Sequence, residues 1–435
     1  MKKTLLTICL VWMCFSLSAQ KIIDLSGKWS FSIDRQDNGE KEKWFSHTLN
    51  DFINLPGSMP EKLKGDEVTA KTQWTGSLYD SSYYYNPYME KYRKEGNIKF
   101  PFFLTPDKHY VGAAWYQKEV NIPADWKGER ILLFLERPHI ETTVWVNGQK
   151  TGMQNSLCVP HQYDITRYVR PGKCTITIRV DNRIKEINVG PDSHSITDQT
   201  QGNWNGIVGR ICLQTTPKTY FDDIQIYPEP EQKLARVKVV IKGTGTAKVK
   251  LSAESFNTDK KHIVPAIQQE IKLNKGVTET EMVLPMGNDM LLWDEFHPAL
   301  YKLKAEVTNG KKTEIKEIQF GIRRFEIKGK WFYVNGRKTQ LRGTVENCDF
   351  PLTGYAPMDV ESWERVFRIC RSYGLNHMRF HSFCPPEAAF MAADRVGFYL
   401  QPEGPSWPNH GPKLGLGQPI DKYLMDETIA LTKEY

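Results

Sequence analysis

The clearest structural signal in the first part of the chain is Thr143-Val-Trp-Val-Asn-Gly148. Its two valines alternate with a threonine and a tryptophan, which is the period of a strand that buries one face. The Asn-Gly pair that follows is a strong signal for a type I′ turn between two antiparallel strands. The stretch therefore predicts a β-hairpin with one face in a hydrophobic core.

The same pattern continues on both sides of this hairpin, in short segments that turn signals separate. Ile176, Ile178 and Val180, for example, alternate with a threonine and an arginine before the chain reaches Asp181-Asn182. Strands of this length and spacing are typical of an all-β domain with two packed sheets. We therefore predict a jelly-roll β-sandwich over residues 20–219.

A second region of alternating apolar and polar residues follows, and Pro217, Pro228 and Pro230 lie near its start. One of its segments places Leu303 and Ala305 on a shared face. Six or seven short strands in about 100 residues suit an immunoglobulin-like sandwich. We predict this second domain over residues 220–320.

The period changes after Phe320, where strand-like and helix-like segments alternate. Each predicted helix has a recognisable start and stop, such as Asp359 as an N-cap and Gly374 as a C-terminal glycine. The predicted strands and helices are residues 339–345 (strand), 360–373 (helix), 375–382 (strand), 387–396 (helix), 398–401 (strand) and 421–435 (helix). Such alternation predicts parallel strands with helical crossovers. We assign residues 321–435 to the first three strands of a TIM barrel, so the fold class is multidomain β plus α/β.

The first 19 residues have the layout of a secretory signal peptide. Lys2 and Lys3 precede an apolar run from Leu5 to Leu17, and Ala19 lies at a small-residue cleavage site. We therefore expect an exported protein, periplasmic or extracellular. No later stretch is apolar enough to predict a membrane span. Positive and negative charges are interspersed, so we expect no nucleic-acid partner.

Six cysteines follow the predicted signal peptide, and none forms a CxxC pair. They are Cys158, Cys174, Cys212, Cys348, Cys370 and Cys384. Export permits disulfide bonds, but the spacing assigns no pairing.

Polar side chains gather where the three predicted parallel strands end. They are Glu346 and Asn347 after the first strand, Arg379 and His381 after the second, and Glu403 and Trp407 after the third. Reactive groups of β/α barrels lie at this edge, so we expect a substrate site here. The tryptophan is suited to stack on a sugar ring. The alternative interpretation is that these groups only cap helices and hydrogen-bond loops.

A metal site at His377, His381 and Cys384 is a further hypothesis that the geometry disfavours. Two histidines four apart share a face on a helix, but on a strand they lie about 13 Å apart. We therefore expect no metal, and no motif calls for a cofactor.

The ordered motifs of the chain resemble those of glycoside hydrolase family 2, which includes β-galactosidases and β-glucuronidases. The segments that carry the resemblance are Leu25-Ser-Gly-Lys-Trp-Ser-Phe31, Leu55-Pro-Gly57, Ala114-Trp-Tyr116, Val144-Trp-Val-Asn-Gly148, Tyr163-Asp-Ile-Thr166, Arg179-Val-Asp-Asn182, His297-Pro-Ala-Leu-Tyr301, Phe320-Gly-Ile-Arg-Arg-Phe325 and Leu341-Arg-Gly343. The turn Arg379-Phe-His-Ser-Phe-Cys-Pro-Pro386 departs from the family's usual His-Tyr-Pro pattern, so the resemblance does not indicate which sugar is recognised.

The resemblance implies a retaining glycosidase with two catalytic glutamates, one after the fourth barrel strand and one after the seventh. The 111 residues from Phe325 to Tyr435 are fewer than the roughly 250 of such a barrel. We therefore expect both glutamates beyond Tyr435 and little hydrolysis by this chain alone. By the same resemblance, Asp181 or Asn182 reaches from the jelly roll to the site.

Three functional hypotheses remain open from the sequence. The first is a family 2-like glycosidase that hydrolyses terminal O-glycosidic bonds of a carbohydrate substrate, with Glu346 and Glu403 as an alternative catalytic pair. The second is a non-catalytic carbohydrate-binding protein. The third is one half of a split glycosidase, completed by a chain that supplies the other barrel strands or by an oligomer.

Overall fold

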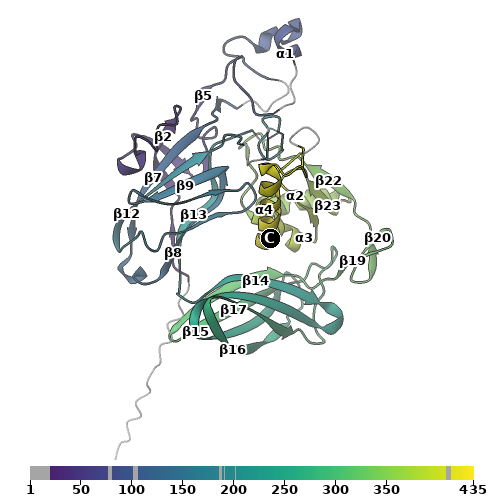
Figure 1. The fold of residues 1–435 in the computed structure, drawn as a ribbon. Coiled ribbons are helices and arrows are strands. Elements are labelled where there is room, and N and C mark those ends of the chain that lie inside the picture. The colour runs from purple at the N-terminus through teal and green to yellow at the C-terminus, as the bar shows by residue number, and fades with distance from the viewer. Residues whose placement is uncertain are drawn as a thin grey trace, which may run out of the picture.

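A computed structural model describes residues 20–76, 81–100, 106–185, 189–190, 192–200, 202–407 and 413–435. The predicted signal peptide lies outside these residues. Along the chain, two β-sandwiches are followed by a region of alternating strands and helices, which we call the strand–helix region (residues 325–435). The first sandwich and the strand–helix region lie side by side, with the second sandwich across one end of both (Figure 1).

The first sandwich consists of two antiparallel sheets that face each other across one core. One sheet has the order β1–β13–β8–β11 with β4 paired to β13, and the other has the order β10–β9–β12–β7–β2–β3. The strands are β1 (Ile22–Asp24), β2 (Gly27–Asp34), β3 (Asp51–Leu55), β4 (Gly57–Ser58), β7 (Ala113–Ile122), β8 (Arg130–His139), β9 (Glu141–Val146), β10 (Gln149–Asn155), β11 (His161–Asp164), β12 (Gly172–Asp181) and β13 (Gly206–Thr216).

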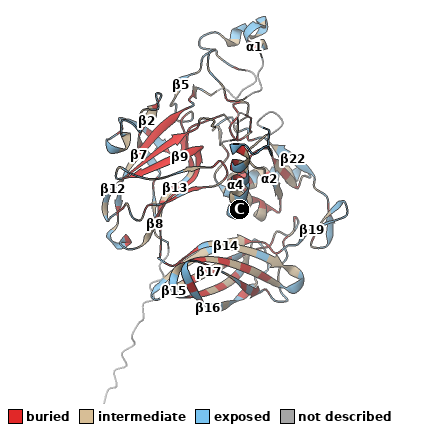
Figure 2. Cartoon of the chain, in the orientation of Figure 1, coloured by how far each residue is buried: buried red, intermediate tan, exposed pale blue. Residues whose placement is uncertain are grey.

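The predicted hairpin is confirmed as β9–β10. Asn147 and Gly148 both have positive φ, at 49° and 77°, as a type I′ turn requires. Val144 and Val146 are fully buried, together with the alternating residues of β12. Figure 2 shows this as a continuous buried band through the first sandwich.

Short elements lie around this sandwich, and one more, η4, lies within the next sandwich. They are η1 (Trp44–Ser46), β5 (Asp66–Glu67), α1 (Ser82–Tyr85), η2 (Pro87–Tyr92), β6 (Lys108–His109), η3 (Ala124–Trp126) and η4 (Pro230–Gln232). The segment with α1 projects away from the rest of the molecule (Figure 1).

The second sandwich is built around a long two-stranded ribbon. Its strands are β14 (Tyr220–Glu229), β15 (Leu234–Phe256), β16 (Ile263–Pro285), β17 (Leu300–Asn309) and β18 (Lys312–Phe320). The register of β15 against β16 shifts between Gly243 and Gly245. The first half of β15 pairs with β14 and the second half with β17, so one ribbon serves both layers around a single core.

The strand–helix region begins with an antiparallel sheet and continues with a parallel one. The antiparallel sheet contains β19 (Phe325–Lys328), β20 (Trp331–Val334) and β21 (Arg337–Thr339). The parallel sheet contains β22 (Gly343–Glu346), β23 (His377–Phe380) and β24 (Tyr399–Gln401), and the helices are α2 (Val360–Ser372), α3 (Glu387–Val396) and α4 (Pro419–Glu434). None of the helices in the described residues has the length and apolar character needed to cross a bilayer.

Most sequence signals of this region correspond to the observed elements. Asp359 caps α2 by accepting a hydrogen bond from the Ser362 amide, and Gly397 ends α3 with a φ of 77°. Helix α4 begins at Pro419 rather than at Asp421, because Asp421 is the third residue of a capping box.

The prediction of one strand over residues 339–345 is wrong. Thr339 ends β21 by pairing with Phe332 of the antiparallel sheet, whereas Gly343 begins β22 by pairing with His377. Arg342 lies between the two strands. Its amide donates to the Asn376 side chain and its guanidinium to the Gly374 carbonyl, which turns the chain from one sheet into the other.

Candidate active site

The parallel strands β22, β23 and β24 end at a common edge of their sheet, as the register of the three strands shows. Arg379 is in β23, and Glu403 follows β24. The Arg379 Nε atom donates a hydrogen bond of 2.5 Å to Glu403 Oε1, and the Ser382 amide donates one of 2.8 Å to Oε2. The structure therefore brings together two of the residues that the sequence placed at strand ends.

The charge state of Glu403 follows from these contacts. Burial favours the protonated acid, but the hydrogen bonds from Arg379 and Ser382 outweigh it, and the pKa of Glu403 is lowered. The side chain is 26% exposed. Glu403 is thus an ionised carboxylate with remaining lone pairs that can accept hydrogen bonds from hydroxyl groups.

A second group at the same edge contains three aromatic rings. The His381 ring lies 4.1 Å, centroid to centroid, from the ring of His194, and its Nδ1 atom is 2.6 Å from His194 Nδ1. The Trp407 ring lies 5.1 Å from His194 and 5.3 Å from His381. Burial lowers the pKa of His194 to about 4, and it also lowers the pKa of His381, so both rings are neutral at pH 7.

His194 comes from the first sandwich and was not predicted from the sequence. The loop over residues 192–200 brings it to β23. The Ser195 hydroxyl donates a 2.7 Å hydrogen bond to the Ser382 carbonyl, and the His194 amide donates one of 2.8 Å to the Ser382 hydroxyl. No periodic pattern or known motif in Ser193-His-Ser195 announces this contact, so only the tertiary structure reveals it.

Glu346 forms a carboxyl pair at the end of β22. Its Oε1 atom accepts hydrogen bonds of 2.8 Å from the Cys348 amide and 3.3 Å from the Asp349 amide. Burial, and next the Asp349 carboxylate, raise the pKa of Glu346 to about 7. Glu346 is therefore protonated much more readily than Glu403 near neutral pH. Asn347 is exposed beside it.

The structure places Asp181 and Asn182 elsewhere. The Asp181 side chain is 0% exposed and accepts hydrogen bonds from the guanidinium groups of Arg179 and Arg183. Asn182 is also fully buried, where its side chain joins the Gly112 amide to backbone carbonyl groups. These side chains form their hydrogen bonds within the first sandwich itself, and both are fully buried, so neither offers a ligand an exposed atom in this structure.

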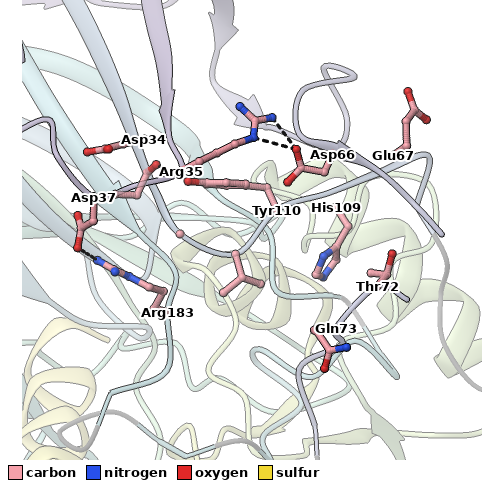
Figure 3. A pocket seen from close by; sticks show the side chains of 13 residues that line it. Asp34, Arg35, Asp37, Asp66, Glu67, Thr72, Gln73, His109, Tyr110 and Arg183 are labelled. Atoms are coloured by element: carbon pink, nitrogen blue, oxygen red, sulfur yellow. Dashed lines mark hydrogen bonds and ion pairs between the residues drawn. The ribbon is translucent and has the colours of Figure 1, made fainter. Parts of the chain in front are cut away.

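A charged cleft of about 410 Å³ lies on the first sandwich (Figure 3). Its walls include Arg35 and Arg183, which pair with Asp66 and Asp37 respectively. Arg183 also pairs with the buried Asp181, so the network behind this cleft fixes one of its walls. The ion pairs satisfy the charges of the cleft internally, and the cleft is separate from the strand-end cluster.

Among the described residues, no three His, Cys, Asp or Glu side chains are placed to hold a metal ion. His381 of the zinc hypothesis contacts His194 rather than His377. The cluster of Arg379, His381, Glu403, Trp407 and His194 therefore offers a carboxylate, hydrogen-bonding imidazoles and an indole ring to one ligand. Polar groups beside an aromatic ring suit a sugar, which has hydroxyl groups around its rim and apolar C–H faces.

Comparison with known proteins agrees with this chemistry. Residues 22–217 match the model for the sugar binding domain of glycosyl hydrolases family 2, and residues 219–323 match a second model of the same family. The chain is 24% identical to a β-glucuronidase of Paenibacillus borealis, over 89% of this chain and 59% of the relative. It is 24% identical to human β-glucuronidase, over 88% of this chain and 57% of the relative.

Solved structures show the same fold. The crystal structure of Ruminococcus gnavus β-glucuronidase superimposes with a TM-score of 0.68 at 20% identity, over 95% of this chain and 64% of that protein. A β-galactosidase of Thermoanaerobacter pseudethanolicus is 25% identical over 72% of this chain and 42% of its own length. The chain thus spans less than two thirds of the length of each of these relatives.

Proposed function

Because the chain belongs to glycosyl hydrolase family 2, we propose that it binds the terminal sugar of a glycoside and serves the hydrolysis of the O-glycosidic bond. One observation carries the proposal. Side chains from two parallel strand ends and from the first sandwich converge in the cluster of Arg379, Glu403, His381, Trp407 and His194.

In this proposal each group of the cluster has a distinct role. The ionised Glu403 accepts hydrogen bonds from two sugar hydroxyls, and Arg379 holds it in place. The His381 and His194 imidazoles exchange donor and acceptor roles with further hydroxyls. Trp407 presents its ring to the C–H face of the sugar. Asn347, exposed at the end of β22, contacts the sugar from the opposite strand.

We also propose the finer architecture that the resemblance implies. Residues 20–219 are the jelly-roll domain, residues 220–320 the immunoglobulin-like domain, and β22, β23 and β24 with α2 and α3 are the opening units of a TIM barrel. The resemblance assigns the catalytic acid and the nucleophile to later strands of such a barrel, so the residues described here bind the substrate. The layout of residues 1–19 supports export to the periplasm or the extracellular space.

A second candidate function is hydrolysis by Glu346 and Glu403 themselves. The observation that favours it is the opposite shift of the two pKa values, which is raised for Glu346 and lowered for Glu403. Glycosidases use one protonated and one ionised carboxyl group for their two steps, and here Glu346 ends β22 while Glu403 follows β24.

The test measures both binding and turnover by the purified chain. A panel of aryl β-glycosides (galactoside, glucuronide, mannoside and glucoside) is assayed for hydrolysis, and the corresponding sugar lactones are titrated by calorimetry. We expect binding of at least one lactone, with affinity reduced about tenfold, or about 1.4 kcal/mol, by Trp407→Ala. Trp331→Ala is the matched control, since Trp331 is an exposed tryptophan of β20 outside the cluster.

The outcomes separate the hypotheses. Binding without turnover supports a recognition role, either in a sugar-binding protein or in a glycosidase that another chain completes. Turnover that both Glu346→Gln and Glu403→Gln abolish supports the second candidate. The proposal is wrong if no lactone or glycoside binds, or if Trp407→Ala and Trp331→Ala affect binding equally.

A further inference from the structure

The turn after β23 joins the first sandwich to the carboxylate of the candidate site. Ser382 lies in this turn, and its carbonyl accepts hydrogen bonds from the Ser195 hydroxyl at 2.7 Å and from the Ser193 hydroxyl at 3.2 Å. The Ser382 amide donates the 2.8 Å hydrogen bond to Glu403 Oε2. Two serines of the first sandwich and a carboxylate of the strand–helix region are therefore bonded to the same residue.

Ser382 has a backbone conformation that serine rarely adopts. Its φ of 45° lies in the left-handed region, which is costly for residues other than glycine, asparagine and aspartate. Besides the two bonds to its carbonyl, the His194 amide donates a 2.8 Å hydrogen bond to the Ser382 hydroxyl. Because the amide, the carbonyl and the side chain of Ser382 share one Cα atom, contacts that fix the carbonyl and the hydroxyl also fix the direction of the N–H bond.

The two serines are themselves held by the first sandwich. Ser193 and Ser195 are buried, and the Ser193 hydroxyl accepts a 3.1 Å hydrogen bond from the Ser195 amide. Asp198 ties the same loop to its surroundings, because its carboxylate accepts hydrogen bonds from the Thr75 amide at 2.5 Å and from the Asn203 amide at 2.9 Å. The serine hydroxyls therefore reach the turn from a loop that is anchored to the first sandwich.

We propose that Ser193 and Ser195 are positioning residues that hold Glu403 in its sugar-binding place through Ser382. The inference rests on the proposed function, in which Glu403 accepts hydrogen bonds from two sugar hydroxyls. Both serines are buried, so they act through the turn rather than by contact with a ligand. A binding group has to be held to within about 0.5 Å, and a supporting shell of hydrogen bonds provides this precision.

The same contacts affect the protonation of Glu403. The groups that face this carboxylate are the Arg379 guanidinium, the Ser382 amide and the imidazole rings of His381 and His194. Burial raises the pKa of Glu403, but the hydrogen bonds from Arg379 and then from Ser382 outweigh it. If the turn is released, the amide loses its alignment and the pKa of Glu403 rises. Acidification should then remove the acceptor carboxylate of the sugar site at a higher pH.

The first measurement does not depend on sugar binding. Glutamates of the full chain are isotope-labelled at the carboxyl carbon and titrated by NMR, and the Glu403 signal is assigned by its absence in Glu403→Gln. We expect a higher pKa of Glu403 in the double variant Ser193→Ala/Ser195→Ala than in the unaltered chain. Ser255→Ala is the matched control, because the Ser255 hydroxyl of the second sandwich also donates to a backbone carbonyl, that of Lys260. An unchanged pKa of Glu403 in the double variant would overturn the proposal.

The second measurement follows the affinity for a sugar lactone at a series of acidic pH values. We expect the double variant to bind about tenfold more weakly, because two hydrogen bonds of ordinary strength are lost, and to lose affinity at a higher pH during acidification. Ser195→Thr keeps the hydroxyl, and the cavity of about 30 Å³ that Ser195 lines has room for the added methyl, so this variant should bind as the unaltered chain does. Equal weakening by Ser195→Thr and Ser195→Ala would contradict a role for the hydroxyl.

The outcomes separate the positioning role from the proposed function. A raised pKa of Glu403 in a chain that binds no lactone supports the positioning role and contradicts the proposed function. Lactone binding and a pKa of Glu403 that the double variant both leaves unchanged support the proposed function and contradict the positioning role. If circular dichroism shows that the double variant does not fold, Ser195→Ala takes its place, since the Ser193 hydroxyl still reaches the turn. We then expect a smaller rise of the pKa, and no rise would overturn the proposal.

Discussion

Asp181 and Glu403 are both carboxylates that form an ion pair with an arginine, yet their surroundings in the molecule differ. Asp181 is 0% exposed and its partner Arg179 is 9% exposed, within a network that also includes Arg183. Glu403 and its partner Arg379 are 26% and 37% exposed. The same pair of chemical groups therefore stabilises a sandwich in one place and faces a potential ligand in the other. Exposure, rather than residue type, separates the two roles.

Removing the buried carboxylate should give the largest effect on stability. Asp181→Ala removes the fully buried acceptor of Arg179 and Arg183, which are then left with Asp37, and breaking a buried ion pair typically costs about 3 kcal/mol or more. We expect the free energy of unfolding of the first sandwich to fall by a similar amount. Circular dichroism during unfolding in urea would measure this fall. Asp125→Asn is the control, because Asp125 is 65% exposed and pairs with Lys21 at the surface, so its loss should change the free energy of unfolding far less.

Removing the exposed carboxylate should instead affect binding. Glu403→Gln keeps the size of the side chain but loses the charge that attracts hydroxyl donors, so the affinity for a sugar lactone should fall about tenfold while the free energy of unfolding changes by less than about 1 kcal/mol. Glu364→Gln is the matched control, since Glu364 of α2 is 24% exposed and also pairs with arginine. If Glu403→Gln and Glu364→Gln lowered the affinity equally, Glu403 would have no special role in binding the sugar.

Glu346, a third carboxylate, extends the comparison because its protonation makes the stability of the chain depend on pH. The pKa of Glu346 is about 7 in the folded chain and near 4.5 in the unfolded one. As pH rises from about 4.5 to 7, the unfolded chain loses this proton first, so stability falls over this window and levels off above it. Glu346→Gln should relieve that loss at pH 8, where both states of the unaltered chain have lost the proton, and should have little effect at pH 4. Parallel pH profiles of urea midpoints for the two proteins would contradict the assignment.

Local signals predicted most of the fold. The turn at Asn147-Gly148, the Asp359 cap and Gly397 each act through their own backbone, so the sequence near them is sufficient. The strand predicted over residues 339–345 failed because tertiary pairing divided it between two sheets. Neither the alternation of apolar residues nor the β-propensity of a segment indicates which strand it will pair with.

The candidate site was predicted in part. Arg379 and Glu403 are in contact, and so are His381 and Trp407, as expected because parallel strands share one carboxyl edge. His194 was missed because its arrival depends on a loop of the first sandwich, about 190 residues earlier in the chain. Asp181 was assigned to the site by resemblance, and its burial could not be known before the packing of β12 and its neighbours was seen.

The docking of residues 192–200 on Ser382 has a consequence for how such a protein can change over evolutionary time. Ser382 has a φ of 45°, and the first sandwich holds both its carbonyl and its hydroxyl group. A substitution on either partner alone would release a strained turn in the middle of the candidate site. A chimaera that joins the first sandwich of one relative to the strand–helix region of another is therefore expected to lose these contacts unless both segments come from the same protein.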